Sequence, residues 1–491
     1  MPRPSEHEIK LYFSDFFEVS RSELRRYGAF NISLLSDLPL FIDPFLLFNS
    51  RKPEYKTLHK DITDYLRFLK DKSISTALEP GLIRALYRFR EVKQNWLGFT
   101  VSGNKGRGLG QEFAEALHRN LYRIFGDEEF SKGSHLEKLC LIEPGVGKDS
   151  ISDFTTNLIK EYLCQYTSTF TKQFISAGLR KRFMVERVHF NYKTETWEAR
   201  PFILPRFLDD FVLLTPRNML TKEDTWINRE DLFSEFDMLR GAVSNDQLRA
   251  QINNYFVKVL PKKASALEKK KAELKTIRRF PELIDTFIKS KEDNGEQAVS
   301  ISAGRVQSSE QLYLQQFGNL VWLLSQKSAF YRVSGRTYHE ARKRVEFLKD
   351  VIENKGGHKV FYVNGTPIQR ETDVHILYRL TWFATASDVS REVNDGRGPA
   401  DFKISLGAKD KTLVEFKLAC NSQLERNLLR QTTVYQKASD AKQVIKVILY
   451  FSQAEYNRVI AILKKLKLEG AEDIVLIDAR SDNKPSGSKA A

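Results

Sequence analysis

Cysteine is scarce in this sequence of 491 residues, which contains only Cys140, Cys164 and Cys420. Because the three lie far apart, the sequence excludes both a disulfide framework and a zinc site built from closely spaced cysteine pairs. So little cysteine in so long a chain is typical of proteins in a reducing compartment. We therefore expect a cytoplasmic protein.

Long hydrophobic runs are also missing. The longest, residues 317–324 and 444–451, are much shorter than the roughly 18 apolar residues that a membrane-spanning helix needs. The first residues do not show the charged segment followed by an apolar segment that defines a signal peptide. The sequence therefore predicts a protein that is neither embedded in a membrane nor exported.

Glycine and proline are too few, at 25 and 15 residues, for a collagen-like or mostly disordered chain. Hydrophobic residues make up 41% of the sequence and charged residues 29%, a balance typical of folded globular proteins. Since a domain usually has roughly 150 residues, this length predicts about three domains.

Negative charge is in deficit, because 63 Asp and Glu face 78 Lys and Arg, which gives a net charge of +15. Such a surplus favours a polyanionic partner such as nucleic acid, whose counterions are released on binding. Basic residues concentrate in residues 262–279, where Leu267, Leu274 and Ile277 recur at helical spacing. We predict a helix whose cationic face either contacts phosphates or simply faces solvent. The candidate nucleic-acid contacts are Lys262, Lys263, Lys269, Lys270 and Lys271.

The pattern of apolar residues divides the chain into regions of different character. We expect a mainly helical region over residues 1–135, an α+β region over 136–290 that ends in the basic helix, a linker and connecting helix over 291–330, a mixed α/β domain over 331–480 and a disordered tail over 481–491. In the second region we expect strands near residues 139–142, 183–192 and 211–214, and a helix from about residue 150. Residues 289–311 are rich in small and polar side chains, which predicts a linker or mobile loop.

The last region alternates short β-branched runs with periodic helices. The pattern predicts helices at residues 336–353, 371–385, 423–438 and 453–468, strands at 401–405, 412–418, 444–450 and 474–477, and a hairpin turn at Asn364-Gly365.

The strand predicted at residues 412–418 carries charge where a buried strand normally has none. Successive side chains of a strand point to opposite faces. Val414, Phe416 and Leu418 therefore share one face, and Glu415 and Lys417 share the other. A carboxylate and an ammonium group should project together from this strand.

A second carboxylate should lie close to this pair. Asp401 begins the preceding strand, and a turn containing Gly407 allows the two strands to pair antiparallel. Carboxylate oxygens are the ligands that Mg²⁺ prefers, and a lysine beside them can orient a nucleophile or stabilise charge on phosphorus. The sequence thus predicts a magnesium site suited to phosphoryl transfer.

The order of Asp401, Glu415 and Lys417, with Pro399 shortly before, resembles the PD-(D/E)XK nuclease superfamily over residues 370–477 or so. The resemblance implies a restriction-endonuclease-like mixed α/β core that hydrolyses phosphodiester bonds of DNA with Mg²⁺ or Mn²⁺ as cofactor. RNA is the alternative substrate. Ala400 between the proline and the aspartate departs from the family pattern.

The same resemblance implies a role for each matching position. Asp401 and Glu415 would bind the metal ion and Lys417 would act in catalysis. A further acid in this superfamily often comes from the helix before the strands, which here offers Glu371 or Asp373, with Glu392 as a third candidate.

Other positions match the superfamily less strongly. Gln431 and Tyr435 reproduce a Gln-x-x-x-Tyr feature of some of these nucleases, which helps to position metal ligands or DNA. Arg397, in the glycine-rich segment before the first strand, is a candidate phosphate contact or a solvent-facing turn residue.

Three weaker signals each have a structural explanation. The glycine-rich residues 103–110 match neither nucleotide-binding pattern. They are expected to be a flexible connection, with a basic loop that touches nucleic acid or cradles phosphate as the alternative. A second ligand site is conceivable at Glu143, Asp149 and Asp153, although helix capping and a solvated polar stripe explain them more simply. His375 is expected to be a packed or surface residue rather than a metal ligand.

The leading hypothesis is a metal-dependent endonuclease of bacterial restriction or phage defence, whose N-terminal two thirds select a substrate, a partner or an active state. The alternative is a nucleic-acid-binding or scaffold protein with a degenerate nuclease fold. A homo-oligomer or a partner protein bound through the N-terminal region is compatible with both.

Overall fold

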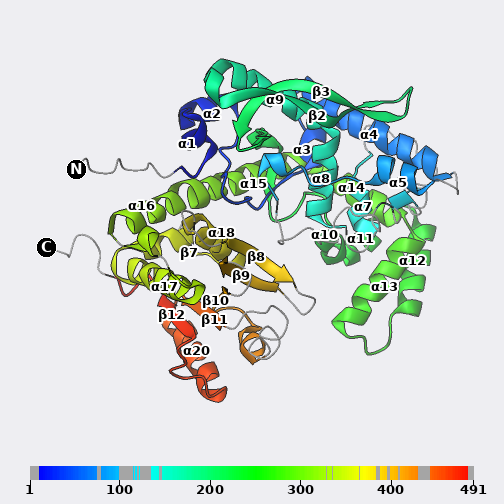
Figure 1. Ribbon diagram of the computed structural model, residues 1–491. Helices are drawn as coiled ribbons and strands as arrows, with labels where there is room; N and C mark the ends of the chain where they lie inside the picture. Colours follow the sequence, from blue (N-terminus) through cyan, green and yellow to red (C-terminus); the bar gives the residue numbers. More distant parts are fainter. Residues whose placement is uncertain are drawn as a thin grey trace.

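The computed structural model describes residues 10–74, 79–98, 114, 117–118, 121, 134–142, 146–327, 329–333, 335–363, 365–382, 388–394, 399–406, 410–429 and 443–484. For residues 142, 326, 327, 380, 388–394 and 399–401 only the backbone is described. The protein has a mixed α/β, multidomain architecture in which helices outnumber strands (Figure 1).

The N-terminal part of the chain is largely helical. Its elements are α1 (Phe13–Phe17), α2 (Arg21–Tyr27), β1 (Leu40–Ile42), α3 (Pro44–Phe48), α4 (Pro53–Ile74), α5 (Pro80–Tyr87) and the 3₁₀ turn η1 (Lys93–Asn95). The helix α4 buries Tyr55, Leu58, Ile62 and Leu66, which recur every three or four residues and therefore form one apolar stripe facing the core. Residues 114, 117, 118 and 121 are also helical, in the region predicted to be mainly helical.

A three-stranded sheet follows. The elements are α7 (Lys138–Ile142), α8 (Lys148–Leu158), α9 (Lys160–Phe174), η2 (Ala177–Leu179), β2 (Arg180–Asn191), β3 (Thr196–Phe207), β4 (Asp210–Phe211), η3 (Arg217–Met219) and β5 (Leu220–Lys222). The strands β2, β3 and β4 form an antiparallel sheet, and β5 pairs with β1. The strand predicted at residues 139–142 is wrong, because these residues form α7; so short an apolar run has no period that separates strand from helix.

The basic segment forms one arm of a helical hairpin that projects from the body of the molecule (Figure 1). The elements here are α10 (Arg229–Ser234), α11 (Phe236–Ala242), α12 (Asp246–Val259), α13 (Ala266–Arg279) and α14 (Glu282–Asp293). A capping box between Ser265 and Glu268 begins α13. Ala272, Thr276 and Ile277 form its buried face, which agrees with the helix predicted for this segment.

The linker predicted at residues 289–311 is wrong, because this segment is helical. After α14 the chain continues as α15 (Gly295–Ser309), the π-helical segment η4 (Glu310–Gln316) and α16 (Phe317–Lys327). The small residues that resemble a linker are instead buried, among them Ala298, Ser302 and Ser309. Small side chains let α15 pack closely on its neighbours, so their function here is packing.

The C-terminal part contains a five-stranded sheet. Its elements are η5 (Phe330–Arg332), α17 (Thr337–Asn354), η6 (Gly357–Phe361), β6 (Tyr362–Val363), β7 (Thr366–Pro367), α18 (Glu371–Thr381), β8 (Asp388–Asn394), β9 (Pro399–Leu406), β10 (Asp410–Leu418), β11 (Gln443–Tyr450), α20 (Gln453–Lys465) and β12 (Ile474–Asp478). The strand order is β12-β11-β10-β9-β8, in which β8, β9 and β10 are antiparallel neighbours and β10, β11 and β12 are parallel. The four predicted strands and the helices predicted at 336–353 and 453–468 are present. The helix predicted at 371–385 ends at Thr381, and the one predicted at 423–438 is described only to residue 429. Asn364 of the predicted hairpin turn lies outside the described residues, and β8 was not predicted.

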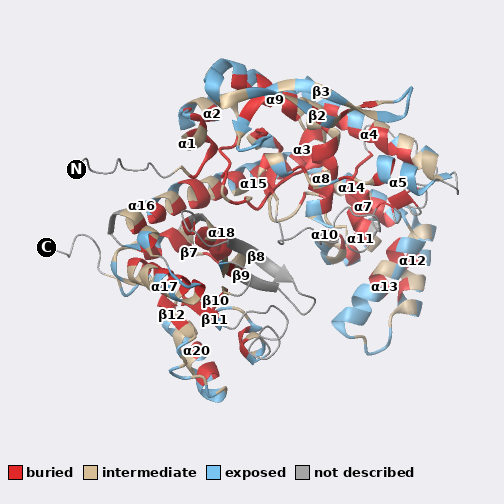
Figure 2. Cartoon of the chain, viewed as in Figure 1, coloured by how far each residue is buried: buried red, intermediate tan, exposed pale blue. Residues whose placement is uncertain are grey.

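Helices pack on both faces of the central strands of this sheet, and Figure 2 shows buried residues along α17 and α18. On one face Tyr378 of α18 packs against Phe402 and Phe416, with ring centroids 4.7 and 4.6 Å apart, and α17 packs beside it. On the other face Val459 of α20 packs in a cluster with Ile448. Because neither face is open, charged groups of the central strand β10 must lie in a mostly buried environment.

Candidate active site at the end of strand β10

The central strand β10 carries the predicted charged pair. Val414, Phe416 and Leu418 lie in the main hydrophobic core, so the predicted alternation of faces is confirmed. Glu415 and Lys417 are nevertheless almost fully buried, with exposed fractions of 1% and 7%. A carboxylate and an amine so deeply buried are costly unless other charged or polar groups compensate them.

Glu371, the first residue of α18, lies against the end of β10. Its Oε2 atom is 3.5 Å from Nζ of Lys417. Its Oε1 atom accepts hydrogen bonds from the backbone N–H of Leu418, at 3.3 Å, and from Nδ2 of Asn421, at 2.7 Å. The structure thus brings together Glu371 and Lys417, which are 46 positions apart in sequence.

The turn after β10 is held by an arginine from the other side of the sheet. Arg458 of α20 donates hydrogen bonds to the carbonyl oxygens of Ala419 and Asn421, at 2.8 and 2.9 Å. These bonds fix the turn from which Asn421 reaches Glu371. Sequence reasoning missed Asn421 and Arg458, because neither belongs to a motif and both act through tertiary contacts.

Asp401 is placed only through its backbone. It lies in β9, one residue from Phe402, which pairs with Val414 of β10. Continuing this antiparallel register by one residue places the backbone of Asp401 opposite Glu415. The carboxylate of Asp401, and the predicted residues Gln431, Tyr435 and Arg397, lie outside the described residues.

Asp373 and Glu392, the other two candidates for the further acid, are placed differently from Glu371. Asp373 is buried and accepts a hydrogen bond from the hydroxyl of Tyr313, and Nζ of Lys222 lies 3.4 Å from its Oδ1 atom. The partners of Asp373 are thus Tyr313 and Lys222, and neither belongs to the strand β10. Glu392 lies in β8, where only the backbone is described.

Two further residues near the site, His375 and Lys446, are buried in the protein interior. His375 of α18 is buried and packs edge-on against Phe402, with ring centroids 5.7 Å apart, as a packed histidine would. Lys446 of β11 pairs in register with Glu415 and is 1% exposed. Its Nζ atom lies 3.7 Å from Asp473. The sheet interior therefore holds a second buried lysine, which sequence reasoning did not single out.

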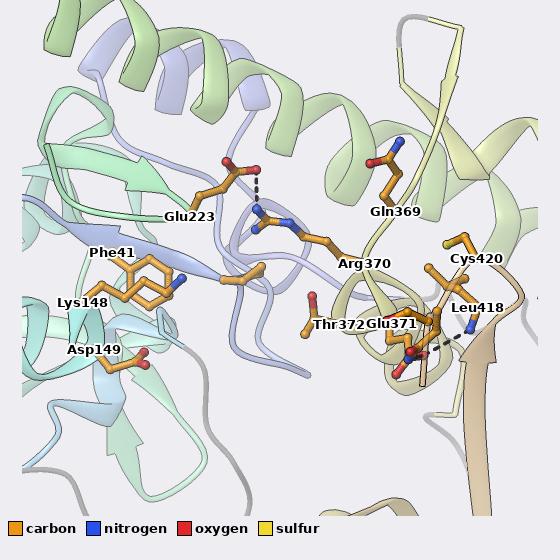
Figure 3. Close-up of a pocket in the computed structure, with 13 residues that line it drawn as sticks. Phe41, Lys148, Asp149, Glu223, Gln369, Arg370, Glu371, Thr372, Leu418 and Cys420 are labelled. Atoms are coloured by element: carbon orange, nitrogen blue, oxygen red, sulfur yellow. Dashed lines mark hydrogen bonds and ion pairs between the residues drawn. The ribbon is translucent and has the colours of Figure 1, made fainter. Parts of the chain in front are cut away.

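A pocket of about 590 Å³ opens beside Glu371. Figure 3 shows Phe41, Lys148 and Glu223 on one side and Glu371 on the other, with Arg370 between them. The first three come from the N-terminal half and the last two from α18 and the residue before it. The remaining residues of the pocket wall are Pro39, Asp149, Gln369, Thr372, Leu418, Cys420, Asn421 and Ser422.

The five basic residues predicted to bind nucleic acid are all exposed. Lys262 and Lys263 lie in the turn between α12 and α13, and the other three lie on α13. Two of these three face acids of neighbouring helices: Lys269 is 3.3 Å from Asp237, and Lys270 is 3.4 Å from Glu230. Lys262 and Lys263 at the tip of the hairpin are exposed and lie outside the helix α13.

The second acidic cluster has the character of a structural site. Burial, followed by the charges of Glu91 and Asp149, raises the pKa of Asp153 to about 8. A carboxyl group that keeps its proton near neutral pH is a poor metal ligand. The glycine-rich residues 103–110 and Glu143 lie outside the described residues.

Two features are absent from the described part of the chain. Its side chains include no group of three or more His, Cys, Asp or Glu close enough to share a metal ion. The carboxylate of Asp401 is not among these described side chains. In the same part of the chain, no helix has the length and apolar character needed to cross a bilayer.

Two family models match separate parts of the chain. One, described as "Domain of unknown function (DUF8370)", matches residues 18–228, and the other, "Domain of unknown function (DUF8371)", matches residues 337–453. No curated protein and no solved structure matches the chain. The second match contains Glu371, Glu415 and Lys417, whereas the N-terminal side of the pocket lies in the first. The chain is therefore similar to the first family over its N-terminal part and to the second over the part that carries the candidate site.

Proposed function

We propose that this protein is a metal-dependent endonuclease of the PD-(D/E)XK type that hydrolyses phosphodiester bonds of DNA, and that it acts in restriction or phage defence. The observation that carries the proposal is the approach of Glu371 to Lys417 at the end of β10, with Glu415 on the same face of that strand. In the superfamily that the sequence resembles, a further acid often comes from the helix before the strands. Asn421 and Leu418 hold that acid toward the strand.

The sheet provides independent support. Its order is β12-β11-β10-β9-β8, in which β8, β9 and β10 are antiparallel neighbours and β11 and β12 run parallel to β10. This order fits the helix, strands, helix and strand sequence that the resemblance implies. This arrangement puts Asp401 of β9 beside Glu415 of β10 at the level of the backbone. A restriction-endonuclease-like core is therefore part of the proposal.

The residues present fit a magnesium ion by their chemistry. Glu371 and Glu415 supply carboxylate oxygens, the hard donors that Mg²⁺ and Mn²⁺ prefer, and the carboxylate of Asp401 would complete the set. An ion held there would neutralise the phosphate and lower the pKa of a bound water. Lys417 would orient the nucleophile or stabilise negative charge on the phosphate, while Asn421 keeps Glu371 in position.

Cleavage of supercoiled plasmid with Mg²⁺ or Mn²⁺ tests the proposal. We expect Lys417→Ala to lower the cleavage rate at least about 100-fold, the usual loss when a charge-stabilising group is removed. Glu415→Gln should abolish Mn²⁺ binding, measured by calorimetry. A matched control is Lys411→Ala in the same strand, since Lys411 is partly exposed at the opposite end of β10. Wild-type protein that cleaves neither DNA nor RNA faster than Lys417→Ala would refute the proposal.

A second function is favoured by the exposed lysines at the tip of the α12–α13 hairpin. Here the protein would hold nucleic acid or serve as a scaffold, and the acids of the sheet would only be structural. Binding would then persist in EDTA and in Glu415→Gln, and would weaken steeply with salt because phosphate contacts release counterions. Metal-independent binding without cleavage would support this alternative over the nuclease.

A further inference from the structure

Two consecutive residues of the N-terminal half, Lys222 and Glu223, form ion pairs with residues on either side of Glu371, the first residue of α18. Lys222 ends β5, and its Nζ atom lies 3.4 Å from Oδ1 of Asp373. The next residue, Glu223, places Oε1 2.8 Å from a guanidinium nitrogen of Arg370. We call these two ion pairs the clasp. They engage the residue before Glu371 and the second residue after it.

The order of charges in the clasp allows only one pairing of its four residues. Lys222 and Glu223 carry charges of opposite sign, and so do their partners Asp373 and Arg370. A shift of the turn by one residue would place like charges together, so the pattern selects one register between the two halves. Charge complementarity therefore fixes where the N-terminal half sits relative to α18.

The clasp has different degrees of burial at its two ends. The side chains of Lys222 and Asp373 are 13% and 6% exposed, and the hydroxyl of Tyr313 also donates a hydrogen bond to Asp373. Arg370 and Glu223 are 45% and 40% exposed and lie in the pocket wall. The buried pair thus anchors the contact, and the exposed pair borders the pocket beside Glu371 (Figure 3).

The backbone at Glu223 is strained. Its φ of +80° lies in the left-handed region, which side chains other than glycine seldom adopt. A second arginine, Arg305 of α15, lies 3.8 Å from Oε2 of Glu223 and donates a hydrogen bond to the carbonyl oxygen of Asp224. Strain that persists between several fixed contacts is a mark of functional positions.

We propose that Lys222 and Glu223 are positioning residues of the nuclease site, through which the N-terminal half sets the orientation of Glu371 and hence the affinity of the site for its metal ion. The inference rests on the proposed function. Partners that orient a metal ligand typically change affinity or activity by tenfold or more when they are removed. The N-terminal half is then an integral part of the site and a point at which activity can be regulated.

Two neutral substitutions separate positioning from simple electrostatics. Glu223→Gln removes a negative charge near the site, and Arg370→Gln removes a positive charge, so electrostatics alone would shift Mn²⁺ affinity in opposite directions. Loss of positioning weakens binding in both variants. We expect each to raise the Mn²⁺ dissociation constant about tenfold and to lower kcat with little change in KM. The double variant should be no worse than Glu223→Gln alone, because that substitution already breaks the ion pair with Arg370.

The measurements use the full chain, Mn²⁺ titration calorimetry and plasmid cleavage. Arg51→Gln is the matched control. Arg51 forms an exposed ion pair with Glu296 of α15 at 3.0 Å, which joins the N-terminal part to a helix other than α18. This variant should change neither the Mn²⁺ dissociation constant nor kcat. Opposite shifts, additive effects or unchanged affinity in the two variants would overturn the clasp while the nuclease stands. Wild type that neither binds Mn²⁺ nor cleaves nucleic acid would overturn the proposed function as well.

Discussion

At the residue scale, the structure shows how one buried environment gives charged groups different roles. Glu371 accepts two hydrogen bonds and lies close to the amine of Lys417, so its carboxylate is held in one orientation at the end of β10. Asp373, two residues on, is occupied by Tyr313 and Lys222. Both are acids in the first turn of α18, and the surroundings alone distinguish them. A sequence motif identifies the residue type, whereas the hydrogen-bond partners identify the role.

One buried histidine should make stability depend on pH. Burial and the neighbouring His135 lower the pKa of His59 to about 4, compared with about 6.5 in an unfolded chain. Between these values the unfolded state binds more protons, so the free energy of unfolding falls as the pH is lowered from 7 toward 4. We expect a loss of roughly 1–2 kcal/mol between pH 7 and pH 5 from this group.

Urea unfolding at the two pH values measures the effect. His59→Phe keeps a ring that can pack against Phe48, whose centroid is 5.2 Å from that of His59, but it cannot be protonated. The variant should therefore lose less stability on acidification than wild type. An equal loss in both proteins would show that other groups determine the pH dependence.

At the scale of elements, the helices follow their local signals and the exceptions have physical causes. A capping box and an apolar stripe place α13 where the pattern predicts a helix. The segment 289–311 differs because composition reports polarity but not packing partners. Its small residues are used in α15 for close contact.

Two glycines should respond in opposite ways to alanine. At Gly357 an added Cβ would lie 2.8 Å from the backbone oxygen of Val351 and 2.9 Å from its Cγ1 atom. Because backbone cannot easily move away, Gly357→Ala should cost about 1–3 kcal/mol. At Gly304, within α15, an added Cβ meets nothing within 4 Å. Gly304→Ala should then stabilise by about 0.5–1 kcal/mol through helix propensity.

Thermal unfolding by circular dichroism is the test, with wild type as reference. The two variants serve as controls for each other, since both add one methyl group to a glycine. Equal melting temperatures for the two would contradict the contacts described at Gly357.

At the scale of the whole molecule, one hydrophobic core joins parts of the chain that the sequence separates. The main cluster of buried residues runs from Phe13 to Ala479. The helix α16 lies in the segment predicted to connect two domains, yet it packs against α17, α18 and η6. The domain boundary near residue 330 therefore remains a prediction, and the packing shows how to test it.

Truncation tests the role of α16. Phe317, Leu320 and Leu324 are buried by at least 99%, and burying each contributes about 1.5–3 kcal/mol. A fragment of residues 331–484 lacks α16 and should unfold at a lower temperature than one of residues 310–484. Calorimetry measures both transitions. Equal transition temperatures would show that the C-terminal domain is complete from residue 331.

Patterns within short stretches of sequence determined much of the candidate site. Alternation along residues 412–418 is enough to predict that Glu415 and Lys417 share a face, because the side-chain period of a strand is a local property. The order of elements from α17 to β12 was predicted on the same basis, apart from β8. The sequence also offered Glu371 as a further acid, but it left Asp373 and Glu392 as alternatives.

Only the tertiary structure placed Glu371 at Lys417 and supplied Asn421, Arg458 and the clasp of Lys222 and Glu223. These contacts join residues whose distance in space bears no relation to their separation in sequence. A local pattern can fix which face of a strand a side chain occupies. Which distant partner it meets depends on how the helices and sheets pack, and that is a property of the whole chain.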